Sequence, residues 1–110
     1  MPEAMDMAFP TIPEDEFVLY VRIIAKPDKG NELATHLRKL IRLTESEPGT
    51  LAYVISQDDQ NPDWFHVYER YTGREAFEQH IASREFVDFA ESGLIASPPG
   101  PKMLKPLKPW

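Results

Sequence analysis

The sequence of 110 residues contains no cysteine, and its other scarcities also exclude classes of protein. Without cysteine the chain cannot build a disulfide framework, hold an iron–sulfur cluster or use a thiol nucleophile. Its five glycines are isolated from one another, so no glycine-rich loop of the kind that binds nucleotide phosphates is present. No apolar run approaches the roughly 20 residues of a membrane-spanning helix. We therefore expect a protein without disulfides, nucleotide cofactor or membrane span.

Basic residues are in the minority, with 12 Lys and Arg against 18 Asp and Glu and a net charge of -6. Nucleic acid is bound by clustered Lys and Arg, and the sequence has no basic stripe. The three histidines at positions 36, 66 and 80 form no closely spaced pair that would suggest a metal site. The N-terminal residues lack both parts of a signal peptide. We expect a cytoplasmic protein that binds neither nucleic acid nor metal.

Prolines mark both ends of the chain, three of them in residues 1–16 and five in residues 97–110. Neither stretch shows the periodicity of a long helix or a central strand. The sequence therefore predicts a flexible N-terminal arm over residues 1–16, a single domain over residues 17–107 and a short tail over residues 108–110.

Hydrophobic periodicity within the domain predicts alternating strands and helices. Strands are expected at residues 17–25, 51–57, 64–71 and 103–107, and helices at residues 31–47, 73–82 and 84–92. Asp28 and Ser83 are expected to cap the first and last helices, and Thr72 with Glu75 forms the pattern of a capping box. The last strand should lie at a sheet edge because Pro106 cannot donate to a central ladder. This order is typical of an α+β, ferredoxin-like split βαβ sandwich.

The strand at residues 64–71 carries aromatic side chains on both of its faces. Strand alternation places Phe65, Val67, Glu69 and Tyr71 on one face and Trp64, His66, Tyr68 and Arg70 on the other. The predicted helices would cover the first face and leave the second, to which Tyr20 and Arg22 also belong, uncovered. A face this aromatic indicates an interface rather than a solvent surface. We expect a homodimer packed sheet to sheet, with a substrate site on this face as the alternative.

The run from Glu47 to Tyr53, the loop with Asn61 and Pro62, the strand end from Val67 to Tyr71, and then Ala76 and His80 resemble a known family. They are similar to the antibiotic biosynthesis monooxygenase domain of the dimeric α+β barrel superfamily, over about residues 17–89. The resemblance implies a dimer whose subunits each hold a cavity between helices and sheet. Members include cofactor-free oxygenases of aromatic polyketides such as anthrones, haem-degrading enzymes, a signal-molecule isomerase and proteins with no known activity. Two departures stand out: Tyr71 replaces the usual Trp, and the first strand lacks the Asn that haem-degrading members carry, which argues against haem.

His80 and Glu69 are the residues best suited to acid–base chemistry. Helical spacing points His80 inward among apolar neighbours, where an imidazole can act as general base. The alternative is a core histidine bonded to a backbone carbonyl or to Glu69. Glu69 could orient His80, act as the base itself or pair with a helix donor, because a buried carboxylate must be paired or protonated.

Aromatic residues supply the remaining parts of the predicted site. Tyr71 and Tyr53 could donate hydrogen bonds to a developing enolate or phenolate oxygen, or simply pack in the core. Phe65, Phe77 and Phe86 are expected to line a substrate cavity together with Tyr53. His36 flanks the apolar stripe of the first helix and suggests no role.

Two classes of function fit these residues. The first is a cofactor-free monooxygenase or oxidase for a phenolic, anthrone-like or polyketide-type substrate in secondary metabolism, because such a substrate can itself give an electron to oxygen once it is deprotonated. A non-oxidative cyclase or an isomerase would need the same groups. The second class is a small dimeric ligand-binding protein in which His80 and Glu69 close a buried network.

Overall fold

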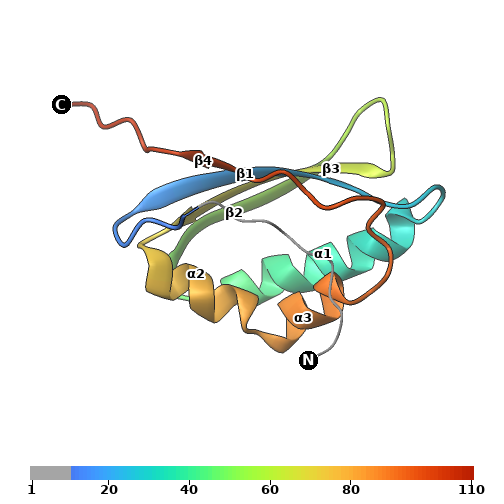
Figure 1. Ribbon diagram of the computed structural model, residues 1–110, viewed down its shortest axis with the longest axis horizontal. Helices are drawn as coiled ribbons and strands as arrows, with labels where there is room; N and C mark the ends of the chain where they lie inside the picture. Colours follow the sequence, from blue (N-terminus) through green and yellow to red (C-terminus); the bar gives the residue numbers. More distant parts are fainter. Residues whose placement is uncertain (1–10) are drawn as a thin grey trace.

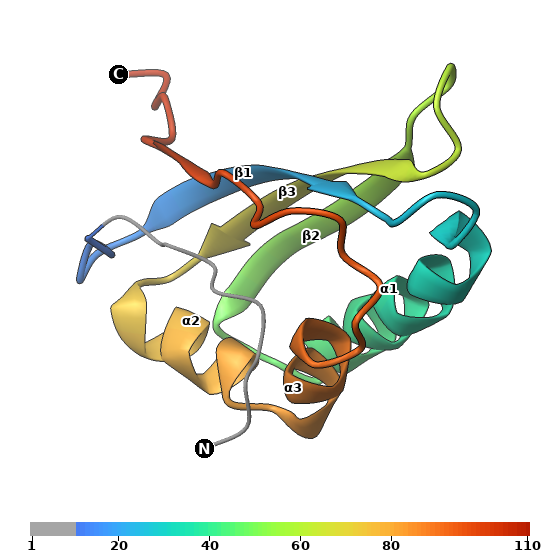
Figure 2. The same ribbon diagram turned by 45° about the vertical axis from the view of Figure 1, so that its right-hand side comes forward.

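The computed structural model describes residues 11–110 and has two layers, a sheet and a set of helices (Figure 1). The elements are β1 (Phe17–Ile24), α1 (Gly30–Thr44), β2 (Thr50–Gln57), β3 (Trp64–Tyr71), α2 (Arg74–Ile81), α3 (Arg84–Ala90) and β4 (Lys102–Leu104). The strands pair antiparallel in the order β2-β3-β1-β4. All three helices lie on one face of this sheet (Figures 1 and 2). The predicted α+β ferredoxin-like fold is confirmed.

The core forms between the helix-covered face of the sheet and the apolar stripes of the helices. β1 contributes four buried residues from alternate positions, as its sequence pattern predicts: Phe17, Leu19, Val21 and Ile23. On β3, Phe65, Val67, Glu69 and Tyr71 are buried on the same face, each paired with one of those β1 residues. Leu33, Leu37 and Leu40 of α1 close the other side of the core. Strand alternation therefore places one carboxylate, Glu69, inside an apolar layer.

The helix caps differ from the prediction at two of three positions. Ser83 caps α3 as expected, because its Oγ accepts a hydrogen bond from the Phe86 N–H at 3.1 Å. The predicted cap by Asp28 is wrong: Lys29 is the N-cap of α1, and the Asp63 carboxylate accepts hydrogen bonds from the Gly30 and Asp28 N–H groups at 2.9 and 3.1 Å. The first N–H group of this helix, that of Gly30, is thus satisfied from a distant loop.

The predicted capping box at Thr72 and Glu75 is also wrong. Gly73 is the N-cap of α2, and no side chain within residues 11–110 caps that helix. Gly73 packs so closely on the N-terminal segment that a Cβ at this position would lie 2.0 Å from the carbonyl oxygen of Glu14. This close approach requires glycine, and it sets the start of the helix in place of a capping side chain.

Replacing Asp63 by alanine is expected to destabilise the protein by about 1–2 kcal/mol, because two N–H groups at the start of α1 lose their acceptor. Asp63→Asn keeps one acceptor oxygen for one of the two N–H groups and should lose about half as much stability as Asp63→Ala. Asp59→Ala, at an exposed position of the same loop, should change the stability by less than about 0.5 kcal/mol. Urea denaturation of the three variants checks this, and equal losses for Asp63→Ala and Asp59→Ala would rule out the cap.

Residues 11–16 pack beside β3 and α2. The Ile12 carbonyl accepts hydrogen bonds from the Arg74 guanidinium at 2.8 and 2.6 Å, and Glu16 forms an ion pair with Arg70. Residues 1–10, the first part of the expected N-terminal arm, lie outside the described residues. No helix within residues 11–110 has the length and apolar composition needed to cross a membrane.

The segment after α3 returns to the free edge of β1 with two residues more than pairing requires. Ile95 pairs with Ala25, and Lys102 pairs with Tyr20, so six residues, 96–101, oppose the four residues 21–24. Figure 2 shows this segment in red, running from the end of α3 up to β4. Within the described part of the chain, residues 97–100 make no hydrogen bond. We call residues 97–101 the proline strap. β4 follows at the sheet edge, as predicted.

Candidate active site

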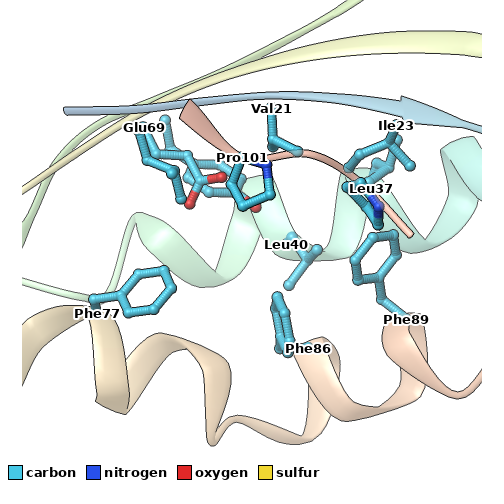
Figure 3. Close-up of a pocket in the computed structure, with 12 residues that line it drawn as sticks. Val21, Ile23, Leu37, Leu40, Glu69, Phe77, Phe86, Phe89 and Pro101 are labelled. Atoms are coloured by element: carbon cyan, nitrogen blue, oxygen red, sulfur yellow. The ribbon is translucent and has the colours of Figure 1, made fainter. Parts of the chain in front are cut away.

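A narrow cavity lies between the sheet and the helices, and Figure 3 shows side chains from both layers pointing into it. Its volume is about 30 Å³, enough for one or two water molecules. The lining residues are Leu19, Val21, Ile23, Leu37, Leu40, Tyr53, Glu69, Phe77, Phe86, Phe89, Pro99 and Pro101. Glu69 and Tyr53 are the polar side chains in this set. The cavity is thus an apolar chamber lined by aliphatic, aromatic and proline side chains, with one carboxyl and one phenol.

Glu69 is the ionisable group that faces the cavity most directly. It is 6% exposed, and its Oε1 accepts a hydrogen bond from the Tyr71 hydroxyl, two residues along the same face of β3. Burial raises the pKa of Glu69 to about 7, although the Tyr71 hydrogen bond lowers it and the nearby Glu47 charge raises it further. Both the protonated and the ionised forms of Glu69 are therefore populated near neutral pH.

The two tyrosines beside Glu69 remain neutral hydrogen-bond donors. Tyr53, on β2, is paired across the strands with Glu69, and Tyr71 is fully buried. Burial raises the pKa of each phenol well above its ordinary value of 10, and the Glu69 charge adds to the effect. Tyr71 directs its O–H to Glu69, whereas Tyr53 lines the cavity.

His80 is 1% exposed on α2, and its partner is Glu47. The distance between His80 Nδ1 and Glu47 Oε1 is 2.9 Å, and the same oxygen accepts a hydrogen bond from Thr50 Oγ1 at 3.1 Å. Burial lowers the pKa of His80, against the raising effect of the Glu47 hydrogen bond and charge. The imidazole is therefore neutral at pH 7, with its proton on Nδ1, because a carboxylate can only accept.

Aromatic contacts connect His80 to the cavity, although His80 itself does not line it. Its ring centroid lies 5.1 Å from that of Tyr53 and 5.8 Å from those of Tyr71 and Phe86. The structure thus brings His80, Glu69, Tyr71 and Tyr53 together. The hydrogen bonding differs: Glu69 pairs with Tyr71, and Glu47, to which sequence reasoning assigned no role, pairs with His80.

The phenylalanines divide between two places. Phe77 and Phe86 line the cavity, whereas Phe65 borders a separate hollow of about 140 Å³ with Arg38 and Gln57. Phe65 precedes Glu69 by four residues, a distance of about 13 Å along a strand. Phe89, absent from the predicted site, is buried and lines the cavity. Its signal in the sequence is the i, i+3 spacing from Phe86, which places both rings on one face of α3.

The uncovered sheet face carries a second set of aromatic and charged side chains. The Tyr20 hydroxyl lies 2.6 Å from His66 Nδ1, and His66 Nε2 lies 2.8 Å from Asp58 Oδ1. The hydrogen bond from His66 lowers the pKa of Asp58 to about 2. The Arg22 guanidinium stacks on Trp64, 4.6 Å from the ring centroid. These groups lie on the far side of the sheet from Glu69 and His80, so they form no part of the cavity.

Comparison with known proteins identifies the family. The model of the antibiotic biosynthesis monooxygenase family matches residues 16–92, which include Glu47, Glu69, Tyr71 and His80. The chain belongs to the antibiotic biosynthesis monooxygenase family. It is also 30% identical over 94 residues to the uncharacterised protein sll1783 of Synechocystis sp., a match covering 84% of this chain and 64% of that protein.

Solved structures of other proteins share the fold of this antibiotic biosynthesis monooxygenase family member. PA3566 from Pseudomonas aeruginosa is 25% identical with a TM-score of 0.78, over 86% of this chain and 96% of that one. Rv0793 from Mycobacterium tuberculosis is 23% identical with a TM-score of 0.74, over 86% and 97% of the two chains. The family match ends at residue 92, before the proline strap.

Proposed function

We propose that this family member is a cofactor-independent monooxygenase or oxidase for a phenolic, anthrone-like or polyketide-type aromatic substrate. The observation that carries the proposal is Glu69, an ionisable carboxyl directed into an apolar, aromatic cavity. Its pKa of about 7 suits a general base at neutral pH. The neutral Tyr53 phenol in the same lining is suited to donate a hydrogen bond to the oxyanion that deprotonation creates.

The proposed reaction begins with transfer of a substrate proton to Glu69. The resulting carbanion or phenolate is electron-rich and gives one electron to oxygen, and the substrate radical and superoxide combine to a peroxide anion. This anion takes the proton back from Glu69 to become a hydroperoxide, which returns Glu69 to its ionised form. For an anthrone-like CH₂ group, loss of water then leaves a carbonyl: one oxygen atom enters the product and the other leaves in water. The apolar cavity excludes bulk water from these steps. Tyr71 orients Glu69 through its hydrogen bond.

A substrate of this size requires the cavity to widen. The volume of about 30 Å³ is far below that of a tricyclic molecule. Pro99 and Pro101 of the proline strap form part of the lining, and residues 97–100 make no hydrogen bond in the described part of the chain. Residues 97–100 of the strap can therefore move without breaking a hydrogen bond to the described part of the chain.

The test of the proposal is oxygen uptake across a pH range with 1,8-dihydroxyanthrone, which has both an anthrone CH₂ group and free hydroxyl groups. For the wild type, kcat/KM is expected to increase about tenfold per pH unit below about 7 and to level off above it, because the ionised Glu69 is the active form. Glu69→Gln should lower kcat/KM at least about 100-fold and abolish this inflection. Glu78→Gln, at an exposed position on α2, is the control and should behave as the wild type.

The same assay separates the oxygenase from the alternatives. Conversion of the substrate that continues unchanged without oxygen would contradict the oxygenase and favour a non-oxidative cyclase or isomerase. The small, enclosed cavity favours the second alternative, a non-catalytic ligand-binding protein. Binding of 1-naphthol without turnover of any phenolic substrate would support that alternative.

We further propose that the protein is a homodimer that pairs through its uncovered sheet face. Large apolar side chains are exposed there, with Val54 at 56% and Tyr68 at 42%. Hydrogen bonds and stacking already fix Tyr20, His66 and Arg22 on this face, so their ordering on association costs little. Sedimentation equilibrium checks the proposal, and a monomer at micromolar concentration would refute it.

A further inference from the structure

Half of the hydrogen-bonding capacity of His80 is unused, although the residue is almost completely buried. Nδ1 contacts Glu47, whereas Nε2 has no hydrogen-bond partner in the described part of the chain. Buried polar atoms in folded proteins are nearly always paired, so each exception calls for an explanation. The rings of Tyr53 and Phe86, which contact the His80 ring, are themselves cavity walls, so His80 adjoins the cavity.

Glu47 decides which atom of His80 carries the proton. With Nδ1–H donated to the carboxylate, Nε2 presents a lone pair to the interior. The opposite tautomer would direct a lone pair at the negative carboxylate and bury an unpaired N–H, which is costly. Glu47 is in place because α1 ends at Thr44, so the chain turns and directs the Glu47 side chain to α2.

We propose that Glu47 is a positioning residue that fixes His80 as an interior proton acceptor, and that Nε2 accepts a hydrogen bond from the hydroxyl of a phenolic ligand. The second part rests on the proposed function and specifies its substrate class as an aromatic molecule with a free O–H group. Nε2 holds the ligand hydroxyl as a hydrogen-bond acceptor, whereas Glu69 takes the substrate proton in the proposed reaction.

Several charged or titratable groups surround His80 and must be separated in the test. Glu47 lies before β2, Tyr53 on β2, Glu69 and Tyr71 on β3, and Glu85 on α3. Glu85 raises the pKa of His80 through its charge without a hydrogen bond to the ring. Glu85→Gln is therefore a matched control, because it removes a negative charge near His80 and leaves the Nδ1 contact intact.

The positioning role is tested by ¹H–¹⁵N NMR of the histidine side chains, with His80→Gln used to assign the signals. The wild type should show His80 protonated at Nδ1 and unprotonated at Nε2 at pH 7. Glu47→Gln, whose amide oxygen can still accept, should keep this tautomer but lower the pKa of His80. Glu47→Ala should move the Nε2 resonance toward its protonated position. Glu85→Gln should keep the tautomer. An unchanged His80 spectrum in Glu47→Ala would overturn the positioning role.

The ligand class is tested separately, by binding of 1-naphthol against 1-methoxynaphthalene, which has the same rings without the donor. The wild type should prefer 1-naphthol at least about fivefold, the value of one hydrogen bond. Glu47→Ala should reduce this preference to near one, and Glu85→Gln should keep it. Equal affinity of the wild type for both probes would refute the ligand assignment. If the His80 tautomers behave as expected in all variants but the protein consumes no oxygen, the proposed oxygenase function is refuted and the positioning role of Glu47 stands.

Discussion

Replacing Glu69 by glutamine is expected to make the protein more stable than the wild type at pH 8, by about 3 kcal/mol, and to leave the two equally stable near pH 4. The folded state raises the pKa of Glu69 from 4.5 to about 7, mainly by burial. That change corresponds to about 3 kcal/mol of differential interaction. The glutamine side chain does not ionise, so the variant does not bear this cost.

The wild type loses stability as the pH rises because its folded state binds the Glu69 proton more tightly than its unfolded state does. Between pH 4.5 and 7 the folded state keeps the Glu69 proton that the unfolded state has lost, so the contribution of Glu69 to stability falls as the pH rises through this window. Above pH 7 both states are ionised and the difference is constant. Urea denaturation at pH 4, 6 and 8 measures the effect, with Glu78→Gln as the exposed control. Parallel pH dependence of the wild type and Glu69→Gln would disprove the burial of a destabilising charge.

This expectation ties stability to activity at one residue. The substitution that stabilises the fold at pH 8 is the one that should remove the general base. A carboxyl kept at high energetic cost in an apolar chamber is the pattern expected of a site selected for chemistry rather than for stability.

Truncating Phe89 to alanine is expected to destabilise the protein by about 3–5 kcal/mol, the usual cost of removing a buried phenyl ring. Because Phe89 lines the cavity, the variant gains an apolar space next to an existing one, where benzene can bind. Benzene should therefore raise the urea midpoint of Phe89→Ala and leave that of the wild type unchanged.

Leu33→Ala is the matched control for this prediction. Leu33 is as deeply buried as Phe89 but lies outside the cavity lining, so its truncation should destabilise the protein without creating a benzene site. An equal response of both variants to benzene would show that the ligand does not use the cavity.

Those parts of the fold that depend on local periodicity could be predicted from the sequence. Alternation placed Phe17, Leu19, Val21 and Ile23 on the buried face of β1, and it turned Glu69 and Tyr71 inward together. Ser83 was recognisable as a cap because its partner is three residues away. In contrast, the cap of α1 comes from Asp63, 33 residues beyond Gly30, and no local pattern reveals it.

In the candidate site, too, local contacts could be predicted from the sequence and contacts between distant segments could not. Residues of one strand, such as Glu69 and Tyr71, could be placed together because strand geometry fixes their relation. Glu47 and His80 are also 33 residues apart, and their contact depends on how the turn after α1 meets α2. Phe65 shares the face of Glu69 but not its position along the strand, which alternation alone does not specify.

The two surplus residues in the proline strap bear on the size of the cavity without involving its ionisable groups. Pro99 contributes to the cavity on one side and to a surface hollow of about 230 Å³, with Tyr20 and Arg22, on the other. The strap begins after the end of the family match and contains none of Glu47, Glu69, Tyr71 or His80. Lengthening or shortening it by a residue would resize the chamber and leave the base in place. If Glu69 is the base, as proposed, ligand size and acid–base chemistry are set by different segments of this chain.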